Sequence, residues 1–379
     1  MSRSILYIID AINTLDDSLQ LKLLASELAR SDDWEVHVAV IAPTSDAINP
    51  LAEIDVKIHR LTERTGVSNR DVGVTGMLLA ARVLKGLLGS VQPNVVHTWG
   101  QTAQRCMGTA RAMANSGTPK LKWISTFVRK PEKSGVVVSA LDRYVSKQIE
   151  TVYVPHASLM SFVLETGFTK EQVVVLPNAA VALPDRDETR EKLLQRIGLA
   201  GTSTIVAGTV ADLIPATRMK DLIWATDLLN CIRDDFHLVI FGEGHQQQNL
   251  QRFASFTVAE SHVHFLPPDE AGSLLGALDV YWHSHMLHPL PSPLLCAMAS
   301  AVPVISVYGD GTEEIILHQL TGMAVNYGAR DEFARWTKFL IEKPDAAGQL
   351  AGQGKNHVLE DFPLEEMTSG YLAELDDAS

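Results

Sequence analysis

The chain alternates between short apolar runs and longer segments in which apolar residues recur at helical spacing. The run Ile5–Ile9 is followed by a polar turn around Asn13–Asp17, a helical pattern over Leu19–Ala29 and a second apolar run at Val36–Ile41. Continuous apolar runs are typical of parallel strands that are buried on both faces. The opening segment therefore predicts a β-α-β unit, in which a helix connects two parallel strands.

The same alternation continues along most of the chain. Further strands are predicted at Val56–His59, Asn94–His97, Leu121–Thr126, Thr151–Val154 and Val173–Leu176, with helices at Val74–Leu88, Ala103–Ala114 and around Ser158–Thr166. A second series has strands predicted at Thr204–Thr209, Phe236–Phe241, Val263–Phe265, Leu278–Trp282 and Val302–Val307. Strands separated by helices of this length predict the α/β class, as two Rossmann-like domains in tandem with parallel sheets.

The predicted domain limits follow from where this alternation pauses. Residues 1–184 are the predicted first domain and residues 202–355 the second. The charged segment 185–201 between them is the predicted linker. Residues 356–379 are predicted to form a helical tail that crosses back to the first domain.

The stretch from Leu278 to Val325 carries the most information about function. It predicts a strand at Val280–His283, a polar loop, a helix at about Ser292–Ser300, a strand at Val302–Val307, a turn at 309–311 and a helix that begins at Thr312. Two loops therefore follow the carboxyl ends of adjacent strands and lead into helix N-termini. Free amides and the helix dipole favour a phosphorylated ligand at such a place.

Composition narrows the class of protein. The chain has 379 residues, of which 46% are hydrophobic and 20% charged, with a formal net charge of -13. An acidic chain disfavours a nucleic-acid partner, because phosphates attract clustered Lys and Arg. The three cysteines lack CxxC spacing, which excludes a disulfide framework and favours a reducing cytoplasm. No apolar run approaches 18 residues and the N-terminus has no signal-peptide pattern, so we expect neither secretion by that route nor a membrane span.

The predicted helix Val74–Leu88 leaves two interpretations open. It carries Arg82 and Lys85 in an otherwise apolar sequence, which would suit a helix that lies on a membrane surface. An ordinary helix that covers a sheet is the favoured interpretation.

Several short segments could form a ligand site. Phe241-Gly242-Glu243-Gly244-His245 follows a predicted strand, and its glycines would let the backbone approach a ligand closely. A purely structural turn explains this segment equally well. Pro177-Asn178 closes the last strand of the first domain, and Gly311-Thr312-Glu313 begins a helix in the second.

Together with Ala297–Ser306 (AMASAVPVIS) and Val95–His97 (VVH), these segments resemble the retaining group-1 (family 4) glycosyltransferases of GT-B architecture. The resemblance spans nearly the whole chain, and its specific part is the block LLxAMAxxxPVIxxxxxGxxEII. It implies a nucleotide-sugar donor on the second domain and a glycan, lipid or other acceptor on the first. It further implies transfer with retention across an interdomain cleft, with no cofactor and no metal.

The chain departs from the family pattern at the donor site. The family has two glutamates, eight positions apart, that hold the donor's sugar and ribose hydroxyls, and the matching positions here are His288 and Cys296. A thiol accepts such hydrogen bonds much more weakly than a carboxylate. By the resemblance, the residues expected to contact the donor are Gly242, Gly244, His288, Cys296, Gly311, Thr312 and Glu313.

The expected cations are displaced as well. The family's Arg and Lys, which neutralise the departing diphosphate, match Asp212 and Thr217, although Arg218 and Lys220 lie close by. The family's glycine-rich turn in the first domain is Leu15–Ser18 here, without glycine, and Val128-Arg129 stands where relatives place a histidine. Losing both cations would cost several kcal/mol of transition-state stabilisation unless neighbours substitute. The predicted catalytic residues are therefore Arg218, Lys220, Arg129 and His97.

The remaining candidates each have an ordinary explanation beside the functional one. His283, His285 and His288 are either a metal site, a set in which one histidine bonds a sugar or phosphate, or simple loop polarity. His97 either contacts the acceptor or makes a structural hydrogen bond. Cys296, near a helix start, either has a lowered pKa or is a small buried residue.

Two hypotheses of function follow. The first is a cytoplasmic or membrane-peripheral glycosyltransferase that acts in polysaccharide, glycolipid or glycoprotein-related assembly. The second is a catalytically degenerate GT-B protein that binds or scaffolds an active transferase, which would add a protein partner. A GT-B epimerase would require a cluster of carboxylates and histidines that the sequence does not reveal.

Overall fold

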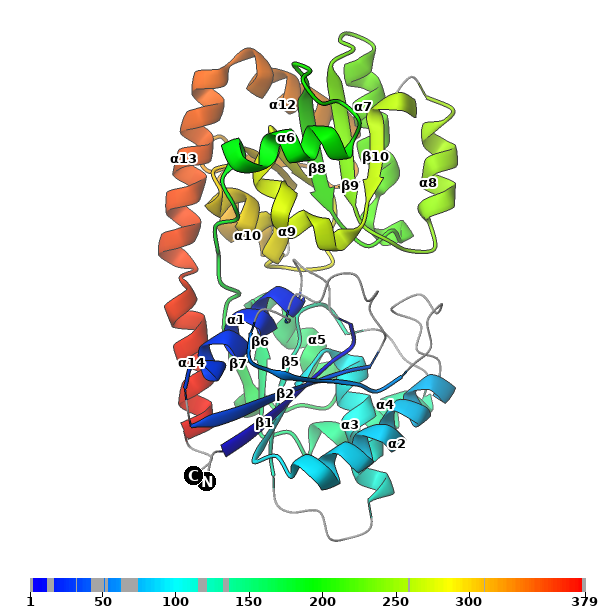
Figure 1. The fold of residues 1–379 in the computed structure, drawn as a ribbon, viewed down its shortest axis with the longest axis vertical. Coiled ribbons are helices and arrows are strands. Elements are labelled where there is room, and N and C mark those ends of the chain that lie inside the picture. Colours follow the sequence, from blue (N-terminus) through cyan, green and yellow to red (C-terminus); the bar gives the residue numbers. More distant parts are fainter. Residues whose placement is uncertain are drawn as a thin grey trace. The chain divides into compact units, whose positions relative to one another are not determined.

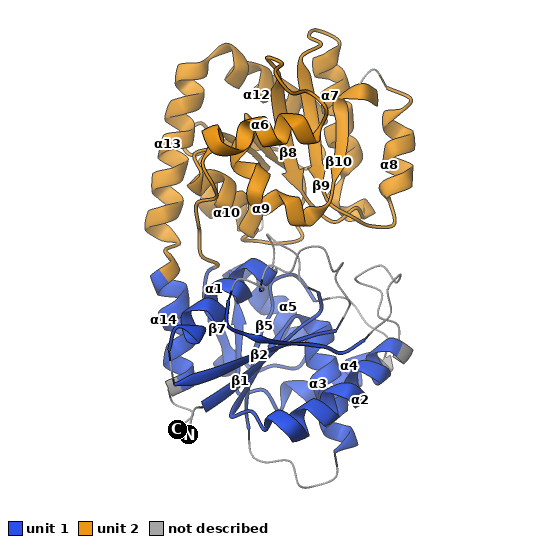
Figure 2. Ribbon diagram, in the orientation of Figure 1, with its two compact units in different colours: residues 1–13, 17–177, 365–379 blue, residues 14–16, 178–364 orange. Residues whose placement is uncertain are grey.

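The computed structural model describes residues 3–11, 17–31, 33–41, 51, 54–62, 74–114, 121–131, 136–257, 260–309 and 311–376. It divides into two compact units, coloured separately in Figure 2. Unit 1 comprises residues 1–13, 17–177 and 365–379, and unit 2 comprises residues 14–16 and 178–364. Each unit is an α/β domain built on one parallel sheet.

Unit 1 contains a seven-stranded sheet in the order β3-β2-β1-β4-β5-β6-β7. Its strands are β1 (Arg3–Ile9), β2 (Trp34–Val40), β3 (Lys57–Arg60), β4 (Val95–Trp99), β5 (Lys122–Thr126), β6 (Thr151–Val154) and β7 (Val173–Val175). All of its strand pairs are parallel, and Ile5 of β1 pairs with Val36 on one side and with Val95 on the other. The order reverses between β1 and β4, the type of position where open α/β sheets bind ligands.

The helices of unit 1 cover both faces of this sheet. They are α1 (Asp17–Ala29), α2 (Val74–Val91), α3 (Gln101–Met113), α4 (Val136–Ser146), α5 (Met160–Glu165) and α14 (Leu364–Asp376). Helices α2, α3 and α4 lie side by side (Figure 1), over a core that includes Leu6 and Ile8 of β1. Successive strand residues point to opposite faces, so Tyr7 points to the other face, where α14 packs.

Unit 2 contains a six-stranded parallel sheet in the order β10-β9-β8-β11-β12-β13. The strands are β8 (Ile205–Val210), β9 (Phe236–Phe241), β10 (Val263–Leu266), β11 (Val280–His283), β12 (Val304–Val307) and β13 (Met323–Val325). The helices are α6 (Arg186–Arg196), α7 (Met219–Asn230), α8 (Gln247–Ala254), α9 (Ala271–Leu274), α10 (Ser292–Ala299), α11 (Thr312–Ile315), α12 (Arg330–Glu342) and α13 (Pro344–Asp361). The prediction of two tandem Rossmann-like domains with parallel sheets is confirmed.

The structure differs from the sequence-based limits at two segments. The expected linker 185–201 contains α6, which is fixed to unit 2 because Arg190 donates to the carbonyls of Ala277 and Thr204 and pairs with Asp279. The boundary expected at 355/356 falls inside α13. Leu15 and Asp16 of the expected glycine-free turn lie outside the described residues. Within the described ranges, no helix is long and apolar enough to cross a membrane.

The tail helix α14 is bound to the sheet of unit 1. Tyr371 shares a hydrogen bond of 3.1 Å with the hydroxyl of Thr126, and its ring centroid lies 4.5 Å from that of Tyr153. Lys122 of β5 forms an ion pair of 2.9 Å with Glu374. These contacts make α14 part of the core of unit 1.

Candidate functional site

Each of the six strands of unit 2 is followed by a loop at its carboxyl end, and two of these loops interlock. The loop after β8 (residues 211–218) and the loop after β9 (residues 242–246) are joined by backbone hydrogen bonds from Leu213 N to Glu243 O, 2.9 Å, and from Gln246 N to Leu213 O, 3.0 Å. A Cβ at Gly242 would lie 2.0 Å from the carbonyl oxygen of Ala211, and one at Gly244 would lie 2.6 Å from that of Leu213. The absence of a Cβ at Gly242 and Gly244 therefore lets the loop after β8, rather than a ligand, approach the loop after β9 closely.

Arg218 lies at the start of α7, where the loop after β8 ends. Its backbone is left-handed, with φ 57°, and its side chain is one third exposed. Its Nε donates to Asp221, 2.5 Å away, and its guanidinium carbon lies 4.8 Å from the ring centroid of Tyr327. An acidic neighbour and an aromatic ring thus fix a partly exposed cation at a helix N-terminus, where the helix dipole also favours an anion.

The two other expected cations lie elsewhere. Lys220 is exposed on the first turn of α7, and its Nζ is 5.5 Å from the ring centroid of Phe253 in α8. Arg129 belongs to unit 1, where it lines a small pocket with Gly100, Arg105 and Lys130 at the carboxyl ends of β4 and β5. Within unit 2, the structure therefore brings Arg218, but not Lys220, into the loops around Gly242 and Gly244.

His283 ends β11, and the loop after it carries His285 and His288 and packs against the turn after β12. His283, His285 and His288 are all buried, and the ring centroids of His283 and His285 are 4.3 Å apart. The hydroxyl of Ser284 donates to the carbonyl of Thr217, 2.7 Å away, which ties this loop to the one that ends at Arg218. Among the described residues, no three His, Cys, Asp or Glu side chains are grouped so that they could hold a metal ion.

After β12, Gly311 and the residues that follow it are fixed by close contacts and hydrogen bonds. A Cβ at Gly311 would lie 2.6 Å from the carbonyl oxygen of Pro289, so this glycine lets the turn contact the histidine loop. Thr312 is fully buried, accepts from Gly309 N and donates to Val307 O, 2.8 Å away. Glu313 accepts from Gly311 N at 2.6 Å. The helix expected at Thr312 ends at Ile315 after a single turn.

Cys296 lies in α10 and has no exposed surface. Burial raises the pKa of its thiol to about 12, although a hydrogen bond with the backbone of Val181 opposes that increase. The alternative of a lowered pKa is therefore wrong, and a small buried residue is what the structure contains. The neighbouring chain is fixed to the same helix, since Leu183 N donates to the Ser300 hydroxyl.

His97 lies in the middle of β4 in unit 1 and is 1% exposed. Its Nε2 is 2.8 Å from the Thr126 hydroxyl, and its ring lies among those of Tyr7, Trp99 and Tyr371. Burial lowers the pKa of His97 to about 3, so the ring is neutral near pH 7. Of the two alternatives for His97, acceptor contact and a structural hydrogen bond, the structure contains the hydrogen bond.

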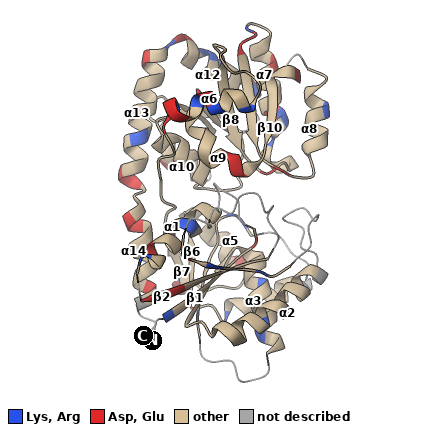
Figure 3. Ribbon diagram, viewed as in Figure 1, with Lys and Arg blue, Asp and Glu red and all other residues tan. Residues whose placement is uncertain are grey.

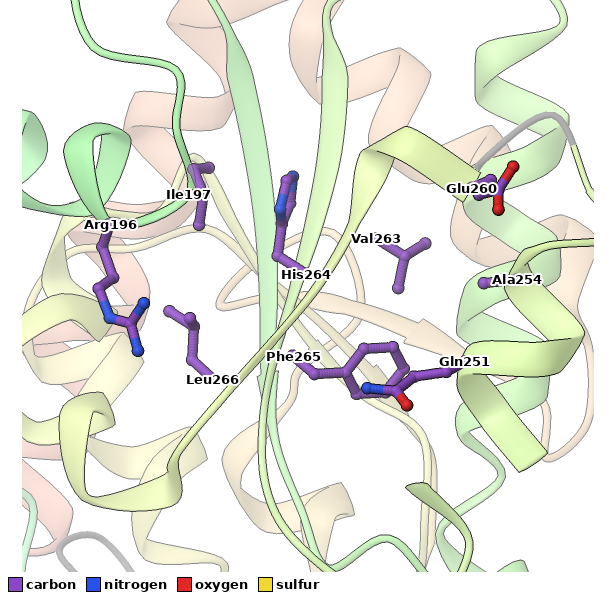
Figure 4. Close-up of a pocket in the computed structure, with 9 residues that line it drawn as sticks. All are labelled: Arg196, Ile197, Gln251, Ala254, Glu260, Val263, His264, Phe265 and Leu266. Atoms are coloured by element: carbon purple, nitrogen blue, oxygen red, sulfur yellow. The ribbon is translucent and has the colours of Figure 1, made fainter. Parts of the chain in front are cut away.

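A pocket in unit 2 lies at the free edge of β10, where the carbonyl of Leu266, one of its lining residues, accepts a hydrogen bond from Gly242 N of the loop after β9. It has a volume of about 400 Å³, and Figure 4 shows β10 running between the end of α6 and α8. His264 and Leu266 lie on the side of Arg196 and Ile197, whereas Val263 and Phe265 lie on the side of α8. None of the predicted site residues lines this pocket.

Sequence reasoning missed Asp221 and Tyr327, the two residues that hold Arg218. Asp221 could have been found, because residues three apart on a helix are neighbours. Tyr327 follows β13, more than one hundred residues away in sequence, and no local pattern relates it to Arg218.

Comparison with known families divides the chain in the same two parts. Residues 190–357 match the family model described as glycosyl transferases group 1. Residues 20–179 match the model described as glycosyl transferase 4-like domain.

Individual proteins are more distant. The lipopolysaccharide core biosynthesis glycosyltransferase LpsE of Rhizobium meliloti is 26% identical over 137 residues, which are 36% of this chain and 40% of LpsE. A GDP-mannose-dependent phosphatidylinositol monomannoside mannosyltransferase of Mycolicibacterium smegmatis is 24% identical over 278 residues, 69% of each chain. The chain thus spans less than half of LpsE and about two thirds of the mannosyltransferase.

Among solved structures, HepE of Anabaena in complex with UDP-glucose superposes with a TM-score of 0.75. The match covers 99% of both chains at 17% sequence identity, and it shows a shared GT-B fold.

Proposed function

Because the chain carries a group 1 glycosyltransferase domain and a glycosyltransferase 4-like domain, we propose that it transfers a sugar from a nucleotide-sugar to a hydroxyl of a glycan or lipid acceptor, with retention. Transfer breaks the bond between the anomeric carbon and the diphosphate oxygen. A new bond forms to the acceptor oxygen, whose proton is released. Negative charge develops on the diphosphate, so the site must supply a positive group there.

Arg218 is the observation that carries this proposal. It is one third exposed at the N-terminus of the 12-residue helix α7, beside the loops that end β8 and β9. Asp221 and Tyr327 hold its side chain in place, so little ordering entropy remains to be lost when a diphosphate binds. We assign Arg218 the role that the family's displaced arginine and lysine would have had.

The relatives support the chemistry of the two substrates. HepE was solved with UDP-glucose, which supports a nucleoside diphosphate sugar as donor. LpsE acts in lipopolysaccharide core biosynthesis and the mannosyltransferase on a phosphatidylinositol mannoside, which supports a glycan or glycolipid acceptor. We further propose a cytoplasmic location, because Cys106, Cys231 and Cys296 are all free thiols.

The first experiment is calorimetric titration with UDP, GDP and their common sugars, with and without magnesium. We expect one nucleotide-sugar to bind at micromolar concentration. Replacing Arg218 with Ala should weaken binding by about tenfold to a hundredfold, the value of a charge-assisted hydrogen bond to phosphate. Arg335→Ala is the matched control, because Arg335 also pairs with an acid three residues away on a helix of unit 2.

The outcomes separate the proposal from its rival. Equal binding by wild type and Arg218→Ala would remove Arg218 from the donor site. A folded protein that binds no nucleotide would favour the second candidate function, a binding partner of an active transferase. The buried Cys296 and the placement of Lys220 over Phe253 favour that candidate, because neither residue presents the expected group to a donor.

A further inference from the structure

Helix α2 has two apolar faces. Ala80, Ala81 and Leu84 are fully buried against the sheet of unit 1, as expected for a helix that covers a sheet. Three large apolar side chains nevertheless point to solvent: Leu78 is 43% exposed, Leu79 51% and Val83 49%. Because these positions are one to five residues apart, they form one patch on the outer side of the helix.

The charged side chains of α2 have one sign. Arg82 and Lys85 are exposed on the same outer side, and α2 contains no Asp or Glu. Residues 72–131 contain eight Lys or Arg and no acid, a formal charge of +8 in a chain of net charge -13, although Arg105 and Lys122 are paired with Asp142 and Glu374 from outside the segment. The remainder of the chain therefore carries -21. Figure 3 shows this segregation on α2 and α3, where Lys and Arg occur without Asp or Glu.

The exposed leucines and cations together favour one class of partner over two others. A second copy of the chain, paired through the same patch, would bring two sets of Arg82 and Lys85 together and be opposed by like-charge repulsion. A nucleic acid would use the cations but leave the leucines in water. An anionic lipid surface uses both, because acyl chains accept the leucines while headgroups attract the cations.

We propose that the exposed side of α2, defined by Leu78, Leu79, Arg82, Val83 and Lys85, docks unit 1 on the surface of an anionic lipid bilayer. The helix lies in the plane of the interface and does not cross it. The remaining acidic residues, which belong to both units, are repelled by the same surface, and this orients unit 1 with the exposed side of α2 towards the membrane. This docking does not require that the donor site be active.

The test is co-sedimentation of the whole protein with vesicles of phosphatidylcholine, alone or with about 30 mol% phosphatidylglycerol, which gives the vesicles a negative surface potential. We expect binding to the anionic vesicles that is at least about tenfold tighter and that weakens with salt. The double variant Leu78→Ser with Leu79→Ser should lose about tenfold in affinity for these vesicles. The control is Leu317→Ser with Leu320→Ser, which removes two leucines of similar exposure, 41% and 47%, from unit 2.

Charge is tested separately by Arg82→Gln with Lys85→Gln, against Lys192→Gln with Lys338→Gln as exposed lysines of unit 2. The α2 variants should weaken binding to anionic vesicles, and the controls should not. Equal binding of the leucine variant and wild type would overturn the proposal. So would a dimer in sedimentation that dissociates in the leucine variant, because the patch would then be a self-association surface. Donor titration without lipid should be the same for all these variants, which separates this proposal from that of sugar transfer.

Discussion

The substitution Gly242→Ala tests how the candidate donor site is built. The added Cβ would lie 2.0 Å from the carbonyl oxygen of Ala211, whereas real Cβ contacts essentially never fall below 3.0 Å. The loop after β8 must therefore move by roughly 1 Å, which strains the hydrogen bonds between Leu213 and Glu243 and between Gln246 and Leu213. Two such bonds contribute about 2 kcal/mol and overpacking costs a further 1–3, so we expect unit 2 to lose about 3–5 kcal/mol.

The measurement is thermal unfolding followed by circular dichroism, combined with titration of the donor. A loss of this size should lower the unfolding temperature of unit 2 by roughly 10 °C. Donor binding should weaken as well, because the displaced loop carries Arg218. The matched control is Gly86→Ala in α2, whose Cβ would meet nothing within 4 Å and which should stabilise the helix by about 0.5–1 kcal/mol. If Gly242→Ala unfolds at the temperature of the wild type, the interlocked loops are not what requires this glycine.

Three other outcomes follow from buried groups. Arg190→Ala should destabilise unit 2 by about 2–4 kcal/mol in denaturant unfolding, because Arg190 bonds α6 to two carbonyls and an acid. The control is Arg196→Ala, which removes a more exposed arginine of the same helix. If both variants lose the same stability, α6 is a loosely held linker. A thiol reagent should modify one thiol quickly in the folded protein and none in Cys231→Ser, since the other two cysteines are buried; two fast thiols would contradict this. Burial lowers the pKa of His97 to about 3 and that of His237 to about 4 from 6.5. As the pH falls, these histidines take up protons in the unfolded chain before they do so in the folded protein. The free energy of unfolding is therefore intact above pH 6.5 and falls as the pH is lowered towards 4. Denaturation midpoints that do not change between pH 7.5 and 5 would refute this prediction.

The sequence predicted the sheets well because their signal is local. The run Ile5–Ile9 is apolar at every position and Phe236–Phe241 at every position but His237, a pattern that favours a strand buried on both faces. Helix α6 was expected to be a linker because its charges suggest solvent. Its arginines instead bond to carbonyls some ninety residues away, and periodicity contains no information about such partners.

The candidate site was less predictable for the same reason. The sequence marks Gly242 and Gly244 as a turn, but what lies against them is the backbone of another loop. The position of Cys296 near a helix start left open whether its pKa is lowered or it is a small buried residue, and the sequence does not show its contact with the backbone of Val181. Arg218 was expected to serve the donor because it lies near the family's cation positions, and that role remains a prediction.

The return of α14 to unit 1 makes unit 2 an inserted domain. Residues 178–364 form a continuous piece, whereas unit 1 is assembled from segments on both sides of it. During synthesis Tyr371 and Glu374 leave the ribosome after residues 178–364. The sheet of unit 1 therefore cannot be covered by α14 until those residues have been made. We expect the product of a gene fragment that encodes residues 178–364 to fold into unit 2 without residues 14–16. A fragment that stops at residue 177 leaves the face around Tyr7, His97 and Tyr153 uncovered and is expected to aggregate.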